Sequence, residues 1–226
     1  MNELRLETLS YRYPKGDTAL NSLSLCIKAG ESVGIFGENG SGKSTLLKAI
    51  AGLISVDTGK IFLNGKEITD DIPQKRNVAF LFQQTFLYPH LTVYQNLKMG
   101  LNYYGLSESE IDLRIKEMLI ALKMTKKVNF RPSFLSEGEK QRIAIGKALI
   151  REPDLLLLDE SFAHLDETNK TKSIELIRNL RAQLGFSVIL VDHDAVNLTR
   201  LVDRVVRMEK GKIIGDSDVL TFAKTL

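Results

Sequence analysis

The chain has 226 residues, of which 31 are basic and 28 acidic, so its formal net charge is +3. This near balance gives no support for a general nucleic-acid binder, because such proteins carry a marked basic excess. No run of about 18 apolar residues occurs, which excludes a membrane-spanning helix, and the MNELRLETLS start lacks the apolar core of a secretion signal. The single cysteine, Cys26, excludes an internal disulfide and fits a reducing compartment. We therefore expect a cytoplasmic protein with one large α/β domain or two modest ones.

The first third of the chain shows the patterns of β-strands. After an alternation of apolar and polar residues at the start, LSLCIKAGESVGIF contains two apolar runs separated by a turn at Ala29-Gly30. In KIFLNGKEI, the pair Asn64-Gly65 lies between apolar runs, which is a strong signal of a hairpin with a type I′ turn. The run NVAFLF at 77–82 predicts a further strand.

Helical patterns fill the middle of the chain, over about residues 92–150. Ser107 and Glu110 have the spacing of a capping box, in which each side chain satisfies a backbone N–H of the other at a helix start. Apolar residues then recur at helical spacing. FLSEGEKQRIAIGKAL repeats the box with Ser136 and Glu139, so a second helix is expected there, and its start should attract anions.

Two short, unbroken apolar runs in the last third of the chain end in acidic residues. DLLLLDE at 154–160 and SVILVDHD at 187–194 fit buried parallel strands, whose carboxyl ends carry the chemistry of α/β proteins. A helical stretch, IELIRNLRAQL, separates them, and VVRMEKGKII predicts a hairpin around Lys210-Gly211. The fold class is therefore α/β, with a mostly parallel sheet, an antiparallel β part near the N-terminus and a helical insertion.

The stretch GENGSGKST matches the phosphate-loop pattern G-x-x-x-x-G-K-[ST] between a predicted strand and a predicted helix, which is the context that the motif requires. Its glycines let the loop curl so that backbone N–H groups point at phosphates, its lysine adds a mobile positive charge, and its serine hydroxyl can bind Mg²⁺. The alternative is a glycine-rich turn with an incidental lysine, and kinases, GTPases and motors share the motif. The residues predicted to bind the nucleotide are Gly37, Asn39, Gly40, Ser41, Gly42, Lys43, Ser44 and Thr45.

The acids of LLLLDE predict a second part of the same site. We assign Asp159 to Mg²⁺, together with Ser44, and Glu160 to an attacking water, which a carboxylate can orient or deprotonate. The alternative is a pair of solvated acids. His193 ends another predicted strand, and because parallel strands deliver their carboxyl ends to one edge, it should face the phosphates, although a lone histidine there is more often structural. The carboxylates on either side of it in VDHD should favour its charged form if they lie close.

In order and over nearly the whole chain, these motifs resemble those of the ATP-binding subunit of ABC transporters. YRYPKG resembles the aromatic that stacks on adenine, with Tyr13 better placed than Tyr11. LFQQ resembles the Q-loop, which would make Gln83 a catalytic residue and a Mg²⁺ ligand. FLSEGEKQR resembles the family signature, usually written LSGGQ, AHLD resembles the D-loop with Asp166 at its end, and VDHD resembles the H-loop.

The resemblance implies a P-loop NTPase core in about residues 1–91 and 151–226, interrupted by a helical subdomain in about 92–150. It also implies ATP and Mg²⁺ as cofactors. Ser136 and Gly138 of the signature would face the γ-phosphate held by a second subunit, so that two ATP molecules join two chains. Hydrolysis would then open the dimer, and Glu160 and His193 would form the catalytic set with the Q-loop glutamine.

The implied partners are a second ATPase subunit, most simply another copy of the chain, and a membrane-spanning permease at the inner face of the cell membrane. The stretch LFQQTFLYPHLTVYQNLKMGL resembles the corresponding stretch of importers, which have a substrate-binding protein as a further partner. No nucleic-acid partner is expected. Phe86, Leu87, Tyr88 and Leu91 would either line the docking groove or close the subdomain's own core. Because the chain ends soon after the last hairpin, we expect no C-terminal regulatory domain. The rival functions are a soluble ABC-type ATPase acting on nucleic acid or ribosomes, and a P-loop kinase.

Four positions depart from the family pattern. Glu137 and Glu139 stand where Gly and Gln are usual, Ser161 replaces a common Pro, and Asp192 replaces a common Ser or Thr. Because Glu137 would repel a nearby triphosphate, we expect the native chain to dimerise with ATP more weakly than a Glu137→Gly variant. The histidines do not have metal-ligand spacing, so we do not assign a metal to His90 and His164.

Overall fold

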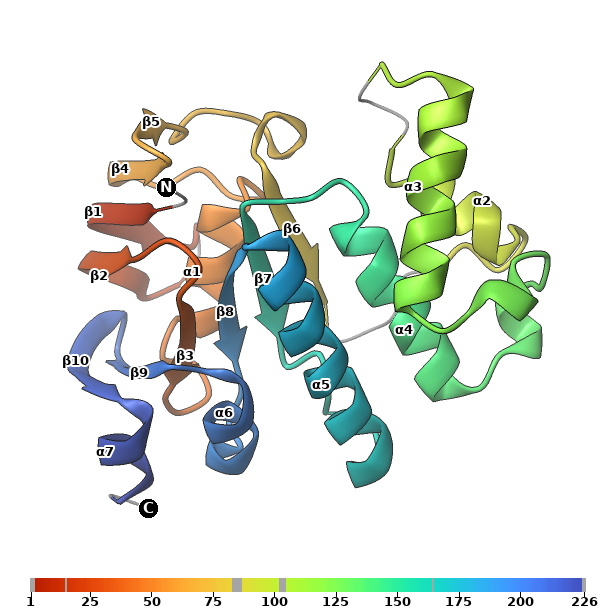
Figure 1. Ribbon diagram of the computed structural model, residues 1–226. Coiled ribbons are helices and arrows are strands. Elements are labelled where there is room, and N and C mark those ends of the chain that lie inside the picture. Colours follow the sequence, from red (N-terminus) through yellow and green to blue (C-terminus); the bar gives the residue numbers. More distant parts are fainter. Residues whose placement is uncertain (1–2, 15, 83–86, 102–104, 164, 225–226) are drawn as a thin grey trace. The chain divides into compact units, whose positions relative to one another are not determined.

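The structure is a computed structural model and describes residues 3–14, 16–82, 87–101, 105–163 and 165–224 (Figure 1). Contacts between residues divide the chain into two compact units, which are described separately below. The first, the sheet unit, comprises Met1–Phe80, Asp154–Glu160 and Gly185–Leu226. The second, the helical unit, comprises Leu81–Pro153 and Ser161–Leu184, and so takes in the predicted helical segment. Within the described residues, no helix is both long and apolar enough to cross a membrane.

An antiparallel sheet forms one layer of the sheet unit. Its order is β2-β1-β4-β5, and the predicted hairpin joins β4 to β5 with Leu63 opposite Lys66. Asn64 and Gly65 have φ values of 56° and 78°, as the predicted type I′ turn requires at its two central positions. The strands are β1 (Leu4–Arg12), β2 (Thr18–Ile27), β4 (Thr58–Leu63) and β5 (Lys66–Glu67).

A six-stranded sheet of order β10-β9-β3-β8-β7-β6 forms the second layer. β3 pairs in parallel with both β8 and β9, and β7 pairs in parallel with β8, which confirms the predicted parallel core. β9 and β10 form the predicted hairpin around Lys210-Gly211. The strands are β3 (Ser32–Phe36), β6 (Val78–Leu81), β7 (Leu155–Asp159), β8 (Ser187–Val191), β9 (Arg204–Glu209) and β10 (Lys212–Asp218).

The turn at Ala29-Gly30 does not form a hairpin. The strands before and after it, β2 and β3, lie in different sheets, so the turn carries the chain from one layer to the other. Gly30 has a φ of 69°, a conformation that costs glycine little.

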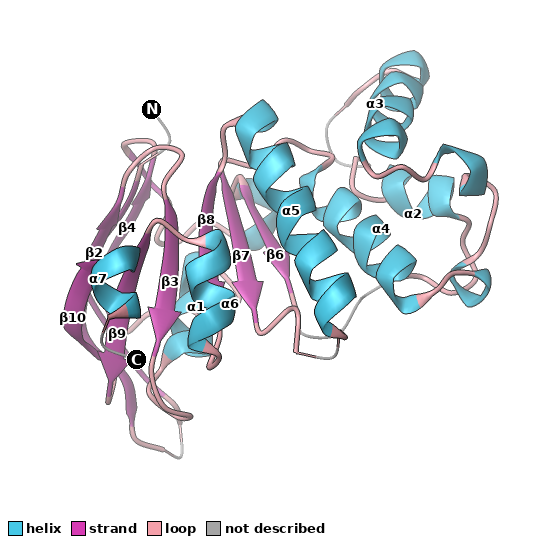
Figure 2. Cartoon of the chain, turned by 60° about the horizontal axis from the view of Figure 1, so that its bottom comes forward, coloured by secondary structure: helices cyan, strands magenta, loops and turns pink. Residues whose placement is uncertain are grey.

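The core of the sheet unit lies between the two sheets, where helix α1 (Lys43–Ile50) is packed. Alternate residues of β3 show why: Val33 and Ile35 belong to this core, whereas Gly34 faces the opposite side. A Cβ at Gly34 would lie 2.9 Å from Leu198 of α6, so the absent side chain lets that helix approach the sheet. Figure 2 shows α6 (Ala195–Leu201) and α7 (Val219–Ala223) over this outer face. The 3₁₀ turn η1 (Pro73–Lys75) precedes β6.

The helical unit begins three of its helices with capping boxes. Two are those predicted, Ser107 with Glu110 and Ser136 with Glu139, and the third pairs Thr92 with Gln95. The helices are α2 (Val93–Lys98), α3 (Glu108–Ala121), α4 (Glu137–Leu149) and α5 (Glu167–Leu184), with 3₁₀ turns η2 (Thr125–Lys127) and η3 (Pro132–Phe134).

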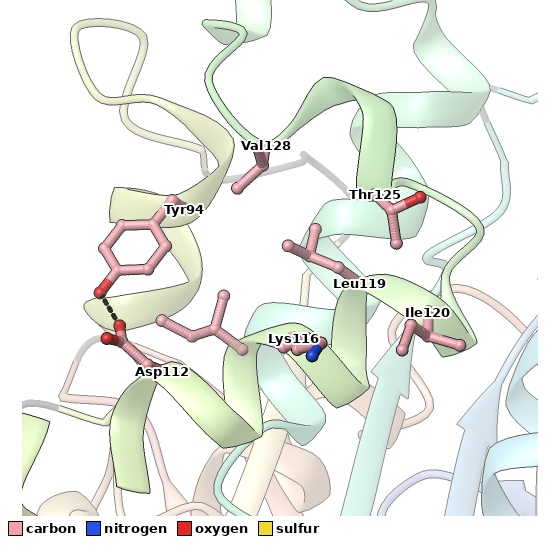
Figure 3. Close-up of a pocket in the computed structure, with 8 residues that line it drawn as sticks. Tyr94, Asp112, Lys116, Leu119, Ile120, Thr125 and Val128 are labelled. Atoms are coloured by element: carbon pink, nitrogen blue, oxygen red, sulfur yellow. Dashed lines mark hydrogen bonds between the residues drawn. The ribbon is translucent and has the colours of Figure 1, made fainter. Parts of the chain in front are cut away.

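The helical unit also contains an apolar cavity of about 350 Å³ between α2, α3 and η2 (Figure 3). The Tyr94 hydroxyl donates a hydrogen bond to Asp112 at its edge, over 2.5 Å. Thr125 begins η2 and Val128 directly follows it. The remaining lining residues are mostly aliphatic: Ile115, Lys116, Leu119, Ile120, Thr125 and Val128.

Candidate functional site

The phosphate-loop residues lead from β3 into α1 and leave the start of that helix uncapped. Gly42 is the N-cap residue, with a φ of 103° and no side-chain cap. A Cβ at Gly42 would lie 2.3 Å from the carbonyl oxygen of Ala19, so both its conformation and its surroundings require glycine. Gly40 also has a positive φ, of 82°. The helix therefore presents free N–H groups and its positive dipole end, as phosphate binding requires.

Gly37 and Ser41 hold the loop in place by a route that differs from the prediction. Gly37 does not adopt a positive φ; instead, a Cβ there would lie 2.2 Å from the carbonyl oxygen of Met208. Ser41 is buried, its N–H donates to the Glu38 carbonyl, and its hydroxyl has no hydrogen-bond partner among the described residues. Glycine is needed at 37 for close packing rather than for curling of the backbone.

Lys43 folds back over the loop. Its ammonium donates to the carbonyl oxygens of Gly37 and Glu38, at 2.7 Å each, and the residue is only 6% exposed. Burial lowers the pKa of this lysine, while Glu160 and Asp159 act in the opposite direction. A lysine held by exchangeable carbonyl contacts can transfer its hydrogen bonds to a phosphate without leaving the site.

Ser44 and Asp159 lie together, from the first turn of α1 and the carboxyl end of β7. The serine hydroxyl donates to a carboxylate oxygen of Asp159 over 2.9 Å. Burial raises the pKa of Asp159, and the hydrogen bond from Ser44 opposes that shift. A hydroxyl and a carboxylate are the hard oxygen ligands that Mg²⁺ prefers, so the residues present fit the predicted ion.

Glu160 and His193 meet at the same edge of the sheet, as the parallel strands predict. The His193 Nδ1 lies 3.5 Å from a Glu160 carboxylate oxygen and 3.9 Å from Asp192. Glu160 has a φ of 46°, which is strained for a residue with a side chain and is typical of functional positions. Its backbone N–H is held by the Val191 carbonyl, so β8 fixes this conformation.

The two aspartates beside His193 have other partners. Asp192 is buried and accepts hydrogen bonds from the Asp194 N–H and the Asn197 amide, and burial raises its pKa. Asp194 caps α6 by accepting from the Val196 N–H. The carboxylate nearest to the His193 ring is therefore that of Glu160, rather than that of either neighbouring aspartate.

A cavity of about 300 Å³ brings most of these predicted residues together within the sheet unit. The Tyr13 hydroxyl lies 3.1 Å from that of Thr45, and its ring packs edge-on against Tyr11 at 5.0 Å between centroids. Asp17, Thr18 and Ala19 also line the cavity, and no motif in the sequence marks them. The lining residues are Tyr13, Asp17, Thr18, Ala19, Asn39, Gly40, Gly42, Lys43, Ser44, Thr45 and Glu160.

The predicted signature and D-loop residues lie in the helical unit, where Asn169 connects them. Asp166 accepts hydrogen bonds from both the backbone N–H and the side-chain amide of Asn169, at 2.9 and 2.6 Å. The other side of that amide meets Gly138, where a Cβ would lie 2.2 Å from the Asn169 oxygen. Ser136 caps α4, the helix of Gly138, by accepting a hydrogen bond from the Glu139 N–H. The three-residue spacing from Asp166 to Asn169 was readable as a capping signal.

The two acidic departures of the signature each face a lysine. Glu137 lies 2.6 Å from the Lys140 ammonium, and Glu139 lies 2.6 Å from that of Lys127. The Lys127 hydrogen bond is the largest cause that lowers the pKa of Glu139. The expected repulsion of a triphosphate by Glu137 is therefore offset in part by its neighbour one turn along α4.

Other predicted positions are placed less completely. Gln83, Phe86 and His164 lie outside the described residues. Tyr88 is partly exposed, and the Lys147 ammonium of α4 lies 4.2 Å from its ring centroid. Ser161 is fully buried and donates to the Leu81 carbonyl over 2.7 Å, which gives the residue in place of proline a structural role.

Comparison with known proteins decides the family. The family model described as ABC transporter matches residues 20–163. The chain belongs to the ABC transporter family. It is 41% identical over 216 residues to the molybdate/tungstate import ATP-binding protein of Pyrococcus abyssi, covering 96% of the chain and 62% of that protein. It is 42% identical over 195 residues to the spermidine/putrescine import ATP-binding protein of Thermotoga maritima, covering 86% and 53%. The ABC transporter chain thus spans little more than half the length of these curated relatives.

Solved structures of ABC transporter proteins have the same fold. The cbiO1 subunit of the cbiONQ ABC transporter complex of Clostridium perfringens matches with a TM-score of 0.90 and 30% identity, covering 98% of this chain and 91% of that one. A dimeric ATP-binding cassette in a post-hydrolysis state, bound to ADP and Pi, matches with a TM-score of 0.81 and 28% identity, covering 96% and 98%. The predicted fold, a P-loop core with β and helical parts, is therefore confirmed.

Proposed function

We propose that this ABC protein binds and hydrolyses ATP to power transport by a separate membrane-spanning permease. The observation that carries the proposal is the single cavity that gathers an uncapped helix start, Lys43 and Glu160. Free N–H groups and an ammonium hold phosphates, and the carboxylate is placed to orient a water. The family of the chain and the names of its relatives support the same activity.

The described residues have distinct roles in the proposed reaction. The phosphate loop binds and orients the triphosphate, and Lys43 stabilises charge on the transferred group. Glu160 accepts a hydrogen bond or a proton from the attacking water, and His193, 3.5 Å away, holds that carboxylate in position. Ser44 and Asp159 would hold Mg²⁺, with Gln83 predicted to join them, and the ion would neutralise charge on the phosphates.

The chain would act as a dimer, with a second copy of itself as the simplest partner. Ser136 and Gly138 of one copy would contact the γ-phosphate held by the other, and Asp166 would lie at the same junction. The dimeric cassette bound to ADP and Pi supports such an arrangement by similarity. Loss of the γ-phosphate would then remove the contacts that hold the dimer closed.

The direction of transport, the permease partner and the location in the cell follow from the same proposal. The relatives named for molybdate/tungstate and for spermidine/putrescine are import proteins, which supports import here. The chain would dock on its permease at the inner face of the membrane, and a substrate-binding protein would deliver the cargo. The net charge of +3 gives no support for a nucleic-acid partner.

A Glu160→Gln variant tests the proposed function. With ATP and Mg²⁺ it should lose about 10²–10⁴-fold in ATPase rate and elute from a sizing column as a dimer, because binding survives while hydrolysis stops. Glu175→Gln, an exposed acid of α5, is the matched control and should behave as the native chain. A Glu160→Gln variant that stays monomeric at saturating ATP contradicts the proposal, and phosphate transfer to an acceptor would favour a kinase.

A further inference from the structure

The start of α4 holds one of its two acids in a closed set of contacts. One oxygen of Glu139 accepts from the Ser136 N–H at 3.0 Å, and the other accepts from the Lys127 ammonium at 2.6 Å. The side chains of this pair are 17% and 33% exposed, so water screens it less than a surface pair. Both oxygens of the capping carboxylate are thus committed within the chain.

Lys127 reaches Glu139 from a different element. It ends the 3₁₀ turn η2, and its ammonium also lies 5.8 Å from the ring centroid of Phe130. The backbone after this turn is anchored on α2, where the Tyr94 N–H donates to the Val128 carbonyl. The lysine is therefore held by a turn with its own support, and it can fix both the position and the charge of the α4 start.

The charge of Glu139 matters because of where it lies. A glutamine at this position can form the same capping box without a charge, as Gln95 does at the start of α2. A carboxylate adds a negative charge within one turn of the helix start, which opposes the attraction of the dipole for an anion. The Lys127 ammonium cancels that charge while leaving the cap intact.

We propose that Lys127 is a positioning residue for ATP held by a second copy of the chain. It neutralises Glu139 and holds the Ser136 turn, so that the α4 start can accept the polyphosphate of the partner's nucleotide. This inference rests on the proposed function, since it requires ATP-dependent pairing of two copies. It assigns to η2 a part in the ATP site that no motif of the chain marks.

Dimerisation in the Glu160→Gln background tests the inference. The quantity to measure is the ATP concentration at which half of the protein is dimeric, by sedimentation at low salt. Lys127→Met should raise it about fivefold, because a partly buried carboxylate is left unpaired near the incoming phosphates. Adding Glu139→Gln to Lys127→Met should return it to within about twofold of the parent, and Lys127→Arg should keep it unchanged.

Lys126→Met is the matched control, since Lys126 is the exposed neighbour on the same turn and should leave the value unchanged. The Lys127→Met defect should also shrink at high salt, which a purely structural role would not produce. The inference is overturned if Lys127→Met dimerises normally, or if Glu139→Gln fails to rescue it. If Lys127→Met does not fold, Glu139→Gln alone decides, because it should dimerise at least as well as the parent. If the parent itself never dimerises with ATP, the proposed function fails first.

Discussion

The start of α1 and the start of α4 are both proposed to bind phosphate, yet they are built in opposite ways. α1 begins at a glycine with no side-chain cap, whereas α4 begins with a complete capping box. At the start of α1, the Lys43 ammonium donates to two carbonyl oxygens of the loop. Around α4, two carboxylates are each paired with a lysine.

The difference indicates which helix start can bind phosphate in an isolated chain and which one acts only when a second chain is present. A helix start without a cap needs another partner for its N–H groups, and phosphate supplies one, so the α1 site suits an isolated chain. A helix that is already capped and balanced in charge is stable without an anion. The Ser136 hydroxyl accepts from Glu139 and still has its own proton to donate, so α4 can add a contact when a partner's phosphate arrives.

Substitutions at the two helix starts should separate ATP binding from dimerisation. The loss of ATP affinity in Lys43→Met is the largest effect expected. Lys43→Met should weaken ATP binding by the isolated chain about 100-fold, because it removes charge-assisted hydrogen bonds to phosphate. Ser136→Ala should leave that affinity unchanged while weakening ATP-dependent dimerisation. Calorimetry and sedimentation on the same samples give both numbers. Loss of monomer affinity in Ser136→Ala would remove the distinction between the two helix starts.

A methyl group at Gly138 should disturb pairing alone. The new Cβ would lie 2.2 Å from the Asn169 side-chain oxygen, so this side chain must move, and its amide N–H would lose the hydrogen bond that it donates to Asp166. We expect about a tenfold rise in the ATP concentration needed for dimerisation, with monomer affinity unchanged. Adding Asn169→Ala relieves the clash and should recover the part of the loss that is steric. A Gly138→Ala variant that pairs normally would show that this contact is adjustable.

The smallest effect is expected at Glu137. Its charge is already paired with Lys140 on the exposed surface, so Glu137→Gly should improve dimerisation by no more than about threefold. Lys140→Met in the native chain should act in the opposite direction, because it leaves the carboxylate unpaired. Sedimentation at two ionic strengths measures both. Equal behaviour of native chain and Glu137→Gly at low salt would mean that this side chain does not affect the nucleotide.

Local signals in the sequence predicted local structure well. The Asn64-Gly65 turn and two capping boxes depend on residues within four positions of one another, and each was found as expected. The partner of a strand depends on the whole topology, so Ala29-Gly30 could be recognised as a turn but not as a passage between sheets. The parallel strands did predict that Glu160 and His193 would lie at one edge, because the direction of a strand fixes where its end lies.

The residues that sequence reasoning could not find act through tertiary contacts. Lys140 lies three positions after Glu137 on a helix, so that pair was readable from spacing alone. Lys127 is 12 positions before Glu139 and meets it only because η2 folds beside α4. The requirement for glycine at 37 likewise comes from the Met208 carbonyl of a distant strand. Motifs mark the groups that touch the nucleotide, whereas the residues that hold those groups follow from the fold.

The η2 turn has two sides, and this offers a route to a small-molecule probe. Thr125 faces the apolar cavity of about 350 Å³ shown in Figure 3, while Lys127 on the same turn holds the capping carboxylate. A small apolar compound seated in that cavity would contact Thr125, on the same turn as Lys127. It would contact none of the phosphate-loop residues, whose sequence pattern many unrelated enzymes share. Fragment screening against Tyr94 and Val128 is therefore a practical starting point for a chemical probe of Lys127 and the α4 start.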